Sequence, residues 1–338
     1  MIKQGSIIIL TAFLGVTESI ASDKDFTDML HACYVEQVTI SEPNRSAGEI
    51  NSWCRERLTN KEKIKNGELS LLQKRIIRER EAGKSANIII PYKRNYILPV
   101  SYQSSPNQES YNAISGDSLL DNVEAKFQLS FKAPLAESLL KKDDILFVGF
   151  TLQSYWQMYN SDISSPFRET NYQPEIFYGI FNDFKVGEWT NLVNVIGIEH
   201  QSNGRSQPLS RSWNRLYAQF VWENDNWAIM FKPWYRLPED KKTEPGQADG
   251  DDNPDIDKYM GYFEFSSVYK WEQQTFGIMF RNNLRSDNRG AMQLDWTFPM
   301  GKRIKGYAQY FNGYGESLID YNHSNQRIGV GFLLTDIF

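Results

Sequence analysis

After Pro91, apolar and polar side chains alternate along the chain in short segments, which is the period of strands that bury one face. Between residues 122 and 134, for example, Phe127, Leu129 and Phe131 alternate with lysine, glutamine and serine. Turn-forming residues separate most of the segments, as expected between strands. The pattern predicts twelve strands, over residues 93–104, 122–134, 144–158, 172–183, 187–200, 212–223, 226–236, 257–270, 272–283, 287–298, 302–314 and 326–338.

An even number of strands of this length suits a closed bacterial barrel better than a β-sandwich, whose strands are usually shorter. Long connections alternate with short ones, as external loops alternate with periplasmic turns in such barrels. The last strand carries its apolar residues on one parity and ends on Phe338, which resembles the signal read by the outer-membrane barrel-assembly machinery. We therefore predict an all-β fold, a twelve-stranded antiparallel transmembrane β-barrel in the outer membrane of a Gram-negative bacterium. The long connections are 105–121, 159–171, 201–211, 237–256 and 315–325.

One of the external connections, residues 238–257, carries a run of aspartates. Carboxylates could bind a cation there, but a solvated loop is the interpretation we prefer for a run of like charges. The aspartates concerned are Asp249, Asp251, Asp252, Asp255 and Asp257.

The N-terminal part of the chain has a different character. Lys3, an apolar run over residues 7–16 and small residues up to Ala21 are typical of a secretory signal peptide, assigned to residues 1–21. The run is too short for a membrane helix, which needs about 20 apolar residues. Residues 22–91 are polar with helical spacing in places, which predicts a small helical periplasmic extension before the barrel domain, residues 92–338. Cys33 and Cys54 belong to this extension, and an exported chain favours a disulfide between them over two free thiols.

Composition agrees with a barrel. The mean hydropathy is −0.53, yet 14% of the residues are aromatic, and transmembrane barrels combine a polar interior with aromatic girdles at both membrane interfaces. A soluble all-β enzyme could share this composition, so the strand pattern decides. The net charge of −5 lacks the basic footprint that nucleic-acid binding requires, and we exclude nucleic acid as a partner.

The chemistry-bearing segment joins the fifth and sixth predicted strands. His200 and Ser202 are two residues apart, so an extended backbone points both side chains to one face, where the imidazole could take the hydroxyl proton. Ile196 and Ile198 share that parity, and in a barrel with a polar lumen their face touches lipid. On the next strand, the apolar parity continues back to Asn214, which the hairpin can place beside His200.

These residues form a candidate hydrolytic site. The Asn214 amide oxygen could accept the second ring N–H of His200 and so fix the ring, as the third member of a catalytic triad does. A neutral amide avoids the cost of desolvating a permanent charge at a hydrocarbon boundary. Gly204, two residues after Ser202, offers a backbone N–H to an oxyanion. A histidine and a serine at this spacing are more often ordinary loop residues, so the surrounding sequence must strengthen the assignment.

Several blocks strengthen it, because in this order they closely resemble the outer-membrane phospholipase A family. The resemblance implies a twelve-stranded barrel that hydrolyses phospholipid sn-1 and sn-2 acyl esters, requires calcium and is activated as a homodimer in the membrane. It also implies that Ser202 is the nucleophile, His200 the base and Asn214 its orienting partner. The blocks are SSPFRETNYQPE at 164–175, HQSNGRSQPLSRSWNRLY at 200–217, KPWY at 232–235, DDNPDIDKYMGY at 251–262 and GYGESLIDYN at 313–322.

For the metal, the resemblance implies Ca²⁺ ligands from the Ser210 side chain and the Arg205 carbonyl of one subunit, with the Ser164 carbonyl of the other. These are oxygen ligands of the kind calcium prefers. Position 207 is acidic in members of the family but is Gln207 here, which puts in doubt any second calcium site that uses that carboxylate. A passive porin and a soluble secreted esterase remain the alternatives to a membrane phospholipase.

Overall fold

The computed structural model describes residues 25–38, 46–66, 69–83, 88–115, 119–141, 143–244, 247, 250–301 and 304–336. The signal peptide expected at residues 1–21 and the terminal Phe338 lie outside the described residues. Two compact units divide the chain between Ile77 and Arg78. Among the described helices, none is both long enough and apolar enough to cross a membrane.

The N-terminal unit is helical. A helix over residues 25–38 and α2 (Ala47–Lys65) are joined by a disulfide between Cys33 and Cys54. Ser46 begins α2 with a reciprocal capping box, in which its side chain accepts from the Glu49 N–H and the Glu49 carboxylate accepts from the Ser46 N–H. The helix α3 (Leu71–Gly83) starts in this unit, and its part from Arg78 onward belongs to the second unit. The small core of the N-terminal unit contains Leu30, Ile50, Leu58 and the two cysteines.

The second unit is an antiparallel sheet of twelve long strands among the described residues, with the short strand β1 (Ile90–Pro91) paired to one of them. The long strands are β2 (Asn95–Gln103), β3 (Val123–Glu137), β4 (Ile145–Trp156), β5 (Phe167–Val186), β6 (Trp189–Ser202), β7 (Ser212–Asn224), β8 (Trp227–Arg236), β9 (Phe263–Trp271), β10 (Gln274–Asn282), β11 (Gly290–Met300), β12 (Ile304–Tyr314) and β13 (Ser324–Thr335).

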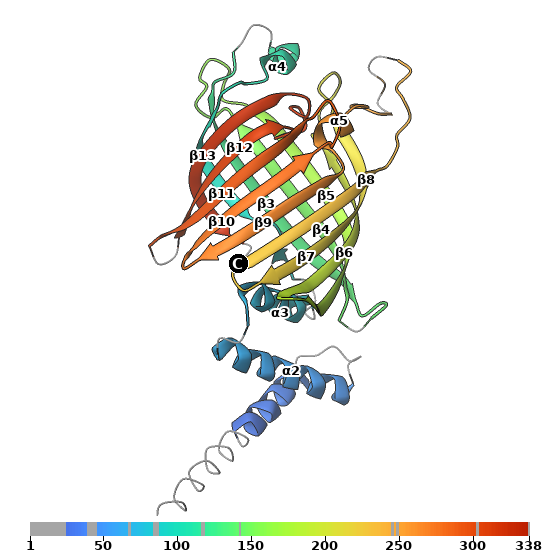
Figure 1. The fold of residues 1–338 in the computed structure, drawn as a ribbon, viewed down its shortest axis with the longest axis vertical. Helices are drawn as coiled ribbons and strands as arrows, with labels where there is room; N and C mark the ends of the chain where they lie inside the picture. Colours follow the sequence, from blue (N-terminus) through green and yellow to red (C-terminus); the bar gives the residue numbers. More distant parts are fainter. Residues whose placement is uncertain are drawn as a thin grey trace, which may run out of the picture. The chain divides into compact units, whose positions relative to one another are not determined.

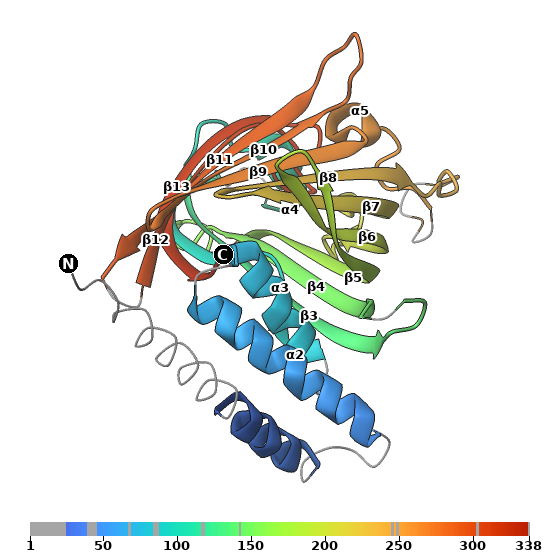
Figure 2. The same ribbon diagram turned by 60° about the horizontal axis from the view of Figure 1, so that its bottom comes forward.

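The sheet closes on itself. Each long strand pairs with its neighbours in the chain, and β13 pairs with β2 through residues such as Ile328 opposite Tyr102 (Figure 1, Figure 2). Closure satisfies the backbone hydrogen bonds of both terminal strands, which a hydrocarbon environment demands. The predicted twelve-stranded antiparallel barrel is confirmed.

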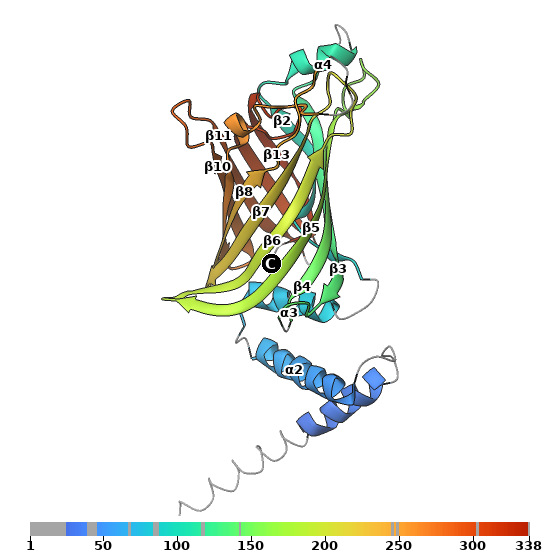
Figure 3. The ribbon, with the colours of Figure 1, turned by 90° about the vertical axis from the view of Figure 1, so that its right-hand side faces the viewer.

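The connections differ between the two ends of the barrel (Figure 3). Two short helices, α4 (Gln108–Ser115) and α5 (Asp257–Met260), lie in the long connections at one end. Short turns, such as the one at residues 225–226, occupy the other end. The eighth predicted strand, residues 257–270, was placed too early, because α5 takes its first residues. Gly261 then has a positive φ of 68°, and a Cβ there would lie 2.3 Å from the Asn282 carbonyl oxygen, so the strand begins only at Phe263.

The two faces of the barrel wall differ in polarity. On β6, Ile196 and Ile198 point outward and are 55% and 48% exposed, whereas Val195 before them and Glu199 after them are buried. The same alternation puts Arg327 of β13 inside, at 2% exposure. An outward apolar band around a polar interior is the pattern of a barrel that sits in lipid.

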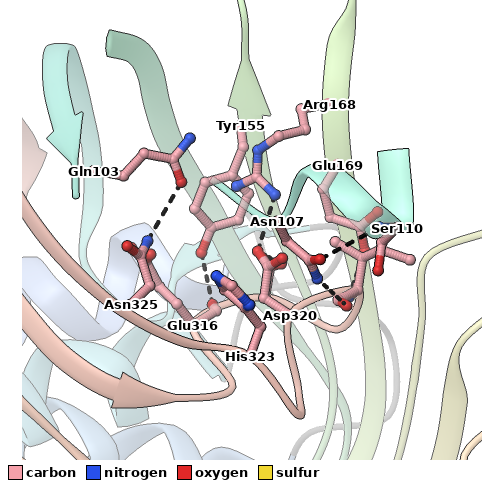
Figure 4. A network of polar contacts seen from close by, with 12 residues as sticks. Gln103, Asn107, Ser110, Tyr155, Arg168, Glu169, Glu316, Asp320, His323 and Asn325 are labelled. Carbon is pink, nitrogen blue, oxygen red and sulfur yellow. Dashed lines mark hydrogen bonds and ion pairs between the residues drawn. The ribbon is translucent and has the colours of Figure 1, made fainter. Parts of the chain in front are cut away.

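Charged side chains of alternating sign fill the external end of the interior. Arg168 lies 2.9 Å from both Glu124 and Asp320, and Arg327 lies 2.8 Å from both Glu124 and Glu316. Asp320 and Glu316 come from the loop between β12 and β13, which therefore folds over the strand ends (Figure 4). Buried charges tolerate removal from water only when they are paired in this way.

One of these carboxyls makes stability depend on pH. Burial alone would raise the pKa of Glu316, but the charges of Arg327 and Lys126 outweigh it and lower the pKa to about 2. A glutamate in an unfolded chain has a pKa of about 4.3. The stabilisation from Glu316 is therefore complete above that value and is lost as the pH falls towards 2.

We expect Glu316→Gln to lower the free energy of unfolding at pH 7 by about 1.5–3 kcal/mol, the range for hydrogen bonds to charged groups. Unfolding in detergent or lipid, followed by circular dichroism between pH 7 and pH 2, measures the difference from the wild type. That difference should shrink below about pH 4. Glu272→Gln, an exposed position in a short turn, is the matched control. A difference that stays constant with pH would contradict the assignment.

Candidate active site

The candidate residues occupy the last positions of a hairpin. His200 and Ser202 end β6, and Asn214 lies near the start of β7. The register pairs His200 with Asn214 and Ser202 with Ser212, so these pairs are the final rungs before the loop at residues 203–211. His200, Ser202 and Asn214 are half-buried and share the outward parity of Ile196. The structure thus places on one face of a single hairpin the three residues that the sequence singled out.

The imidazole of His200 is held by an amide. His200 Nδ1 lies 2.8 Å from Asn214 Oδ1. An amide oxygen only accepts hydrogen bonds, so Nδ1 carries the proton and Nε2 of the neutral ring is left as a base. The other end of the amide is also engaged, because Asn214 Nδ2 donates to Glu239 Oε1 at 3.1 Å. The arrangement fixes both the tautomer of His200 and the orientation of Asn214.

Ser202 is flanked by the neighbouring strand β5 and by the start of the loop that follows it. Tyr172 on β5 lies opposite Ser202 in the sheet register. Gly204 follows in a left-handed conformation with φ of 64°, and a Cβ at that position would lie 3.4 Å from the Tyr172 ring. The backbone therefore turns away from the strand immediately after Ser202, beside an aromatic wall.

The loop after the strand is braced by side-chain contacts of Asn203 and Arg205 that the sequence did not predict. The Asn203 side chain is buried, donates to the Leu209 carbonyl (2.8 Å) and accepts from the Arg211 N–H (3.0 Å). The Arg205 guanidinium donates to the Arg168 carbonyl at 2.6 Å and pairs with Glu169 at 3.4 Å. Asn203 adjoins Ser202 in the chain, but nothing local distinguishes it from a solvated loop residue.

The aspartate-rich connection contacts this loop. Asp252 accepts hydrogen bonds from Ser210 Oγ and Gln207 Nε2, each at 2.5 Å, and pairs with Lys242. Asp251 binds Arg236 through both oxygens at 2.7 Å. The expectation of a merely solvated run is therefore wrong for these aspartates. Asp255 is also engaged, by the Tyr321 hydroxyl at 2.8 Å.

The Ser210 hydroxyl offers an oxygen of the kind that calcium prefers. The Ser210 hydroxyl gives its proton to Asp252, which leaves the oxygen lone pairs free to act as ligands. Among the described residues, no group of three or more histidine, cysteine, aspartate or glutamate side chains could hold a metal. A calcium site built from hydroxyl and backbone carbonyl oxygens would not belong to such a group, because its ligands are not histidine, cysteine, aspartate or glutamate side chains. Ser164 lies in another loop, where its φ is 56°. It is exposed and is therefore accessible to a second molecule.

The barrel is closed and has an outward apolar band, and a histidine–asparagine pair lies beside a serine on that band. These features define the protein class as an outer-membrane β-barrel hydrolase. The family model described as Phospholipase A1 matches residues 72–334. Phospholipase A1 of Klebsiella pneumoniae is 39% identical over 251 residues, which is 74% of this chain and 84% of that protein. Phospholipase A1 of Escherichia coli K12 is 40% identical over 250 residues, 74% of this chain and 82% of that protein. The chain belongs to the phospholipase A1 family.

Solved structures agree. Outer membrane phospholipase A from Escherichia coli superposes with a TM-score of 0.71 at 38% identity, covering 78% of this chain and 98% of that one. An outer membrane phospholipase dimer of Salmonella typhi with bound calcium gives the same four values. A third structure is an active-site mutant of the Escherichia coli protein in which an asparagine is replaced by alanine. The outer-membrane location and the hydrolase class are confirmed, and the porin and soluble-esterase alternatives are wrong.

We expect Asn214→Ala to lower the rate of ester hydrolysis by about 10²-fold, since misorienting a general base costs about that much. Asn214→Asp should remain functional, because a carboxylate oxygen still accepts from His200. Phospholipid hydrolysis in mixed micelles measures both. Asn226→Ala, in the exposed turn at the other end of β7, is the control. A fully active alanine variant would remove Asn214 from the mechanism.

Proposed function

We propose that the chain is a calcium-dependent outer-membrane phospholipase that hydrolyses sn-1 and sn-2 acyl esters of phospholipids and lysophospholipids and is activated by dimerisation. The main support is the 2.8 Å contact between His200 and Asn214 on the lipid-facing wall. His200 is two residues from Ser202 in the chain. The asparagine in the active site of the Escherichia coli relative supports the same role for Asn214.

The reaction follows from this arrangement. His200 Nε2 takes the proton of Ser202 as the hydroxyl oxygen attacks the ester carbonyl. The Gly204 N–H supports the oxyanion of the tetrahedral intermediate, and Asn214 holds the imidazolium. His200 then gives its proton to the leaving alcohol oxygen, which releases lysophospholipid and leaves an acyl-serine. A water molecule, deprotonated by His200, cleaves that ester, and the fatty acid departs as Ser202 regains its proton.

Calcium and dimerisation belong to one site in this proposal. The Ser210 hydroxyl and the Arg205 carbonyl would hold the ion together with the Ser164 carbonyl of a second copy of the chain. A bound calcium ion would supply positive charge near the oxyanion. The description of the Salmonella typhi relative as a dimer with bound calcium supports this assembly. We expect no second calcium site that depends on a carboxylate at position 207, because Gln207 instead donates to Asp252.

The position of the site limits its substrate supply. β6 ends at Ser202 on the side of the long loops, so the site faces the external leaflet, where an intact outer membrane keeps phospholipid scarce. Turnover should therefore be low in an undisturbed membrane and rise when phospholipid reaches that leaflet. Recognition by the barrel-assembly machinery stays a prediction that rests on Phe338.

The central test is release of fatty acid from phospholipid micelles by wild type and Ser202→Ala, each with calcium and with a chelator. We expect the variant and the chelated wild type both to lose activity, by about 10²-fold or more. Ser212→Ala, the cross-strand neighbour of Ser202, tests whether any hydroxyl at this rung suffices. Unchanged fatty-acid release by Ser202→Ala would overturn the assignment.

A second test concerns the metal. Ser210→Ala removes a proposed ligand, so the calcium concentration needed for half-maximal activity should rise about tenfold or more. Calcium-dependent dimers, followed by sedimentation in detergent, should weaken in parallel. Ser206→Ala, an exposed serine of the same loop, is the matched control. Equal activity from a strictly monomeric form would count against dimer activation.

A further inference from the structure

The amide of Asn214 has a second partner outside the triad. Glu239 lies three residues beyond the end of β8, in the connection that leads to α5, and its Oε1 accepts from Asn214 Nδ2 at 3.1 Å. Glu239 is half-buried, whereas its neighbours Pro238 and Asp240 are exposed. The carboxylate therefore points towards the hairpin that carries the candidate site.

Backbone contacts hold the connection in place on both sides of Glu239. The Leu237 N–H donates to the Asn214 carbonyl at 2.8 Å, which continues the pairing of β8 with β7 beyond the strand end. The Asp240 carbonyl accepts from the Asp251 N–H at 2.8 Å, which fastens the outgoing chain. The approach of Glu239 to Asn214 is thus part of the backbone arrangement.

The chemistry of a carboxylate decides which way the amide faces. An asparagine side chain can exchange its oxygen and nitrogen by a flip, and only one orientation presents oxygen to His200. A carboxylate accepts and does not donate, so it selects the amide nitrogen and leaves Oδ1 for the imidazole N–H. Hydrogen bonds to a charged group are roughly twice as strong as neutral ones, and they polarise the amide in the direction that makes its oxygen a better acceptor.

We propose that Glu239 is a positioning residue for the hydrolytic reaction, completing a chain from Ser202 through His200 and Asn214 to a carboxylate in the external loop. This inference rests on the proposed function of the triad. The arrangement gives the imidazolium the benefit of a negative charge while only the neutral amide lies against the lipid-facing histidine. The charge itself stays in the loop, where water can solvate it.

The first experiment compares Glu239→Ala and Glu239→Gln in calcium-loaded enzyme on phospholipid micelles. We expect the alanine variant to lower kcat by about tenfold, the lower end of the losses seen when partners of active groups are removed. KM should stay within about twofold. Glutamine keeps an acceptor oxygen without the charge, so it should restore part of the rate. Glu244→Ala and Glu244→Gln, at an exposed position of the same connection, should leave kcat unchanged.

A double-mutant cycle separates positioning from a general effect on the loop. In an Asn214→Ala background, Glu239→Ala should cause no further loss of kcat, because the group through which it acts is gone. Equal fold-losses with and without Asn214 would overturn the inference. A second result would also overturn it: Glu239→Ala keeps the wild-type kcat, while Asn214→Ala and Ser202→Ala lose activity. If those two variants were instead fully active, the proposed function would fail first. Heat-modified mobility on gels shows that each variant is a folded barrel.

Discussion

A strand in hydrocarbon finds no water, so each of its backbone N–H and C=O groups needs a partner within the protein. The pairing of β13 with β2 meets this demand by removing both edges of the sheet. The surrounding lipid also fixes the register of every hairpin, because a slip of one residue would turn apolar side chains into the interior and charges into lipid. The contact between His200 and Asn214, which are 14 residues apart, is a direct product of that register. The geometry of the proposed active site therefore depends on the same constraint that makes the barrel possible.

The interior solves a complementary problem. Arg168, Arg327 and Lys126 lie among Glu124, Glu316 and Asp320, so in this cluster each charge meets the opposite sign. Two of these carboxylates belong to the β12–β13 loop, which ties the external end of the barrel to its interior. A rigid external end matters because the candidate site is formed by strand ends and loops on that side. The interior charges and the outward site are therefore two aspects of one arrangement.

Most of the fold could be predicted from the sequence because a period of two, repeated over many segments, leaves few alternatives. Parity also placed His200, Ser202 and Asn214 on one face before their contacts were known. Prediction stopped where local pattern no longer determines conformation. The connection between β8 and β9 is shaped by contacts between residues distant in the chain, such as Arg236 with Asp251 and Ser210 with Asp252. The engagement of the aspartates, the late start of β9 and the place of Glu239 all depend on such contacts, and none leaves a periodic signal.

In the proposed function, the outward direction of His200 and Ser202 also determines how substrate meets the enzyme. A phospholipid reaches this site by lateral diffusion within a leaflet and need not pass through water or the barrel interior. The relevant concentration is then a surface density, expressed as the mole fraction of phospholipid among the lipids around the barrel. Diluting the whole suspension leaves this quantity unchanged, whereas mixing in an inert amphiphile lowers it. The bilayer is in this sense both the solvent of the protein and its reservoir of reactant.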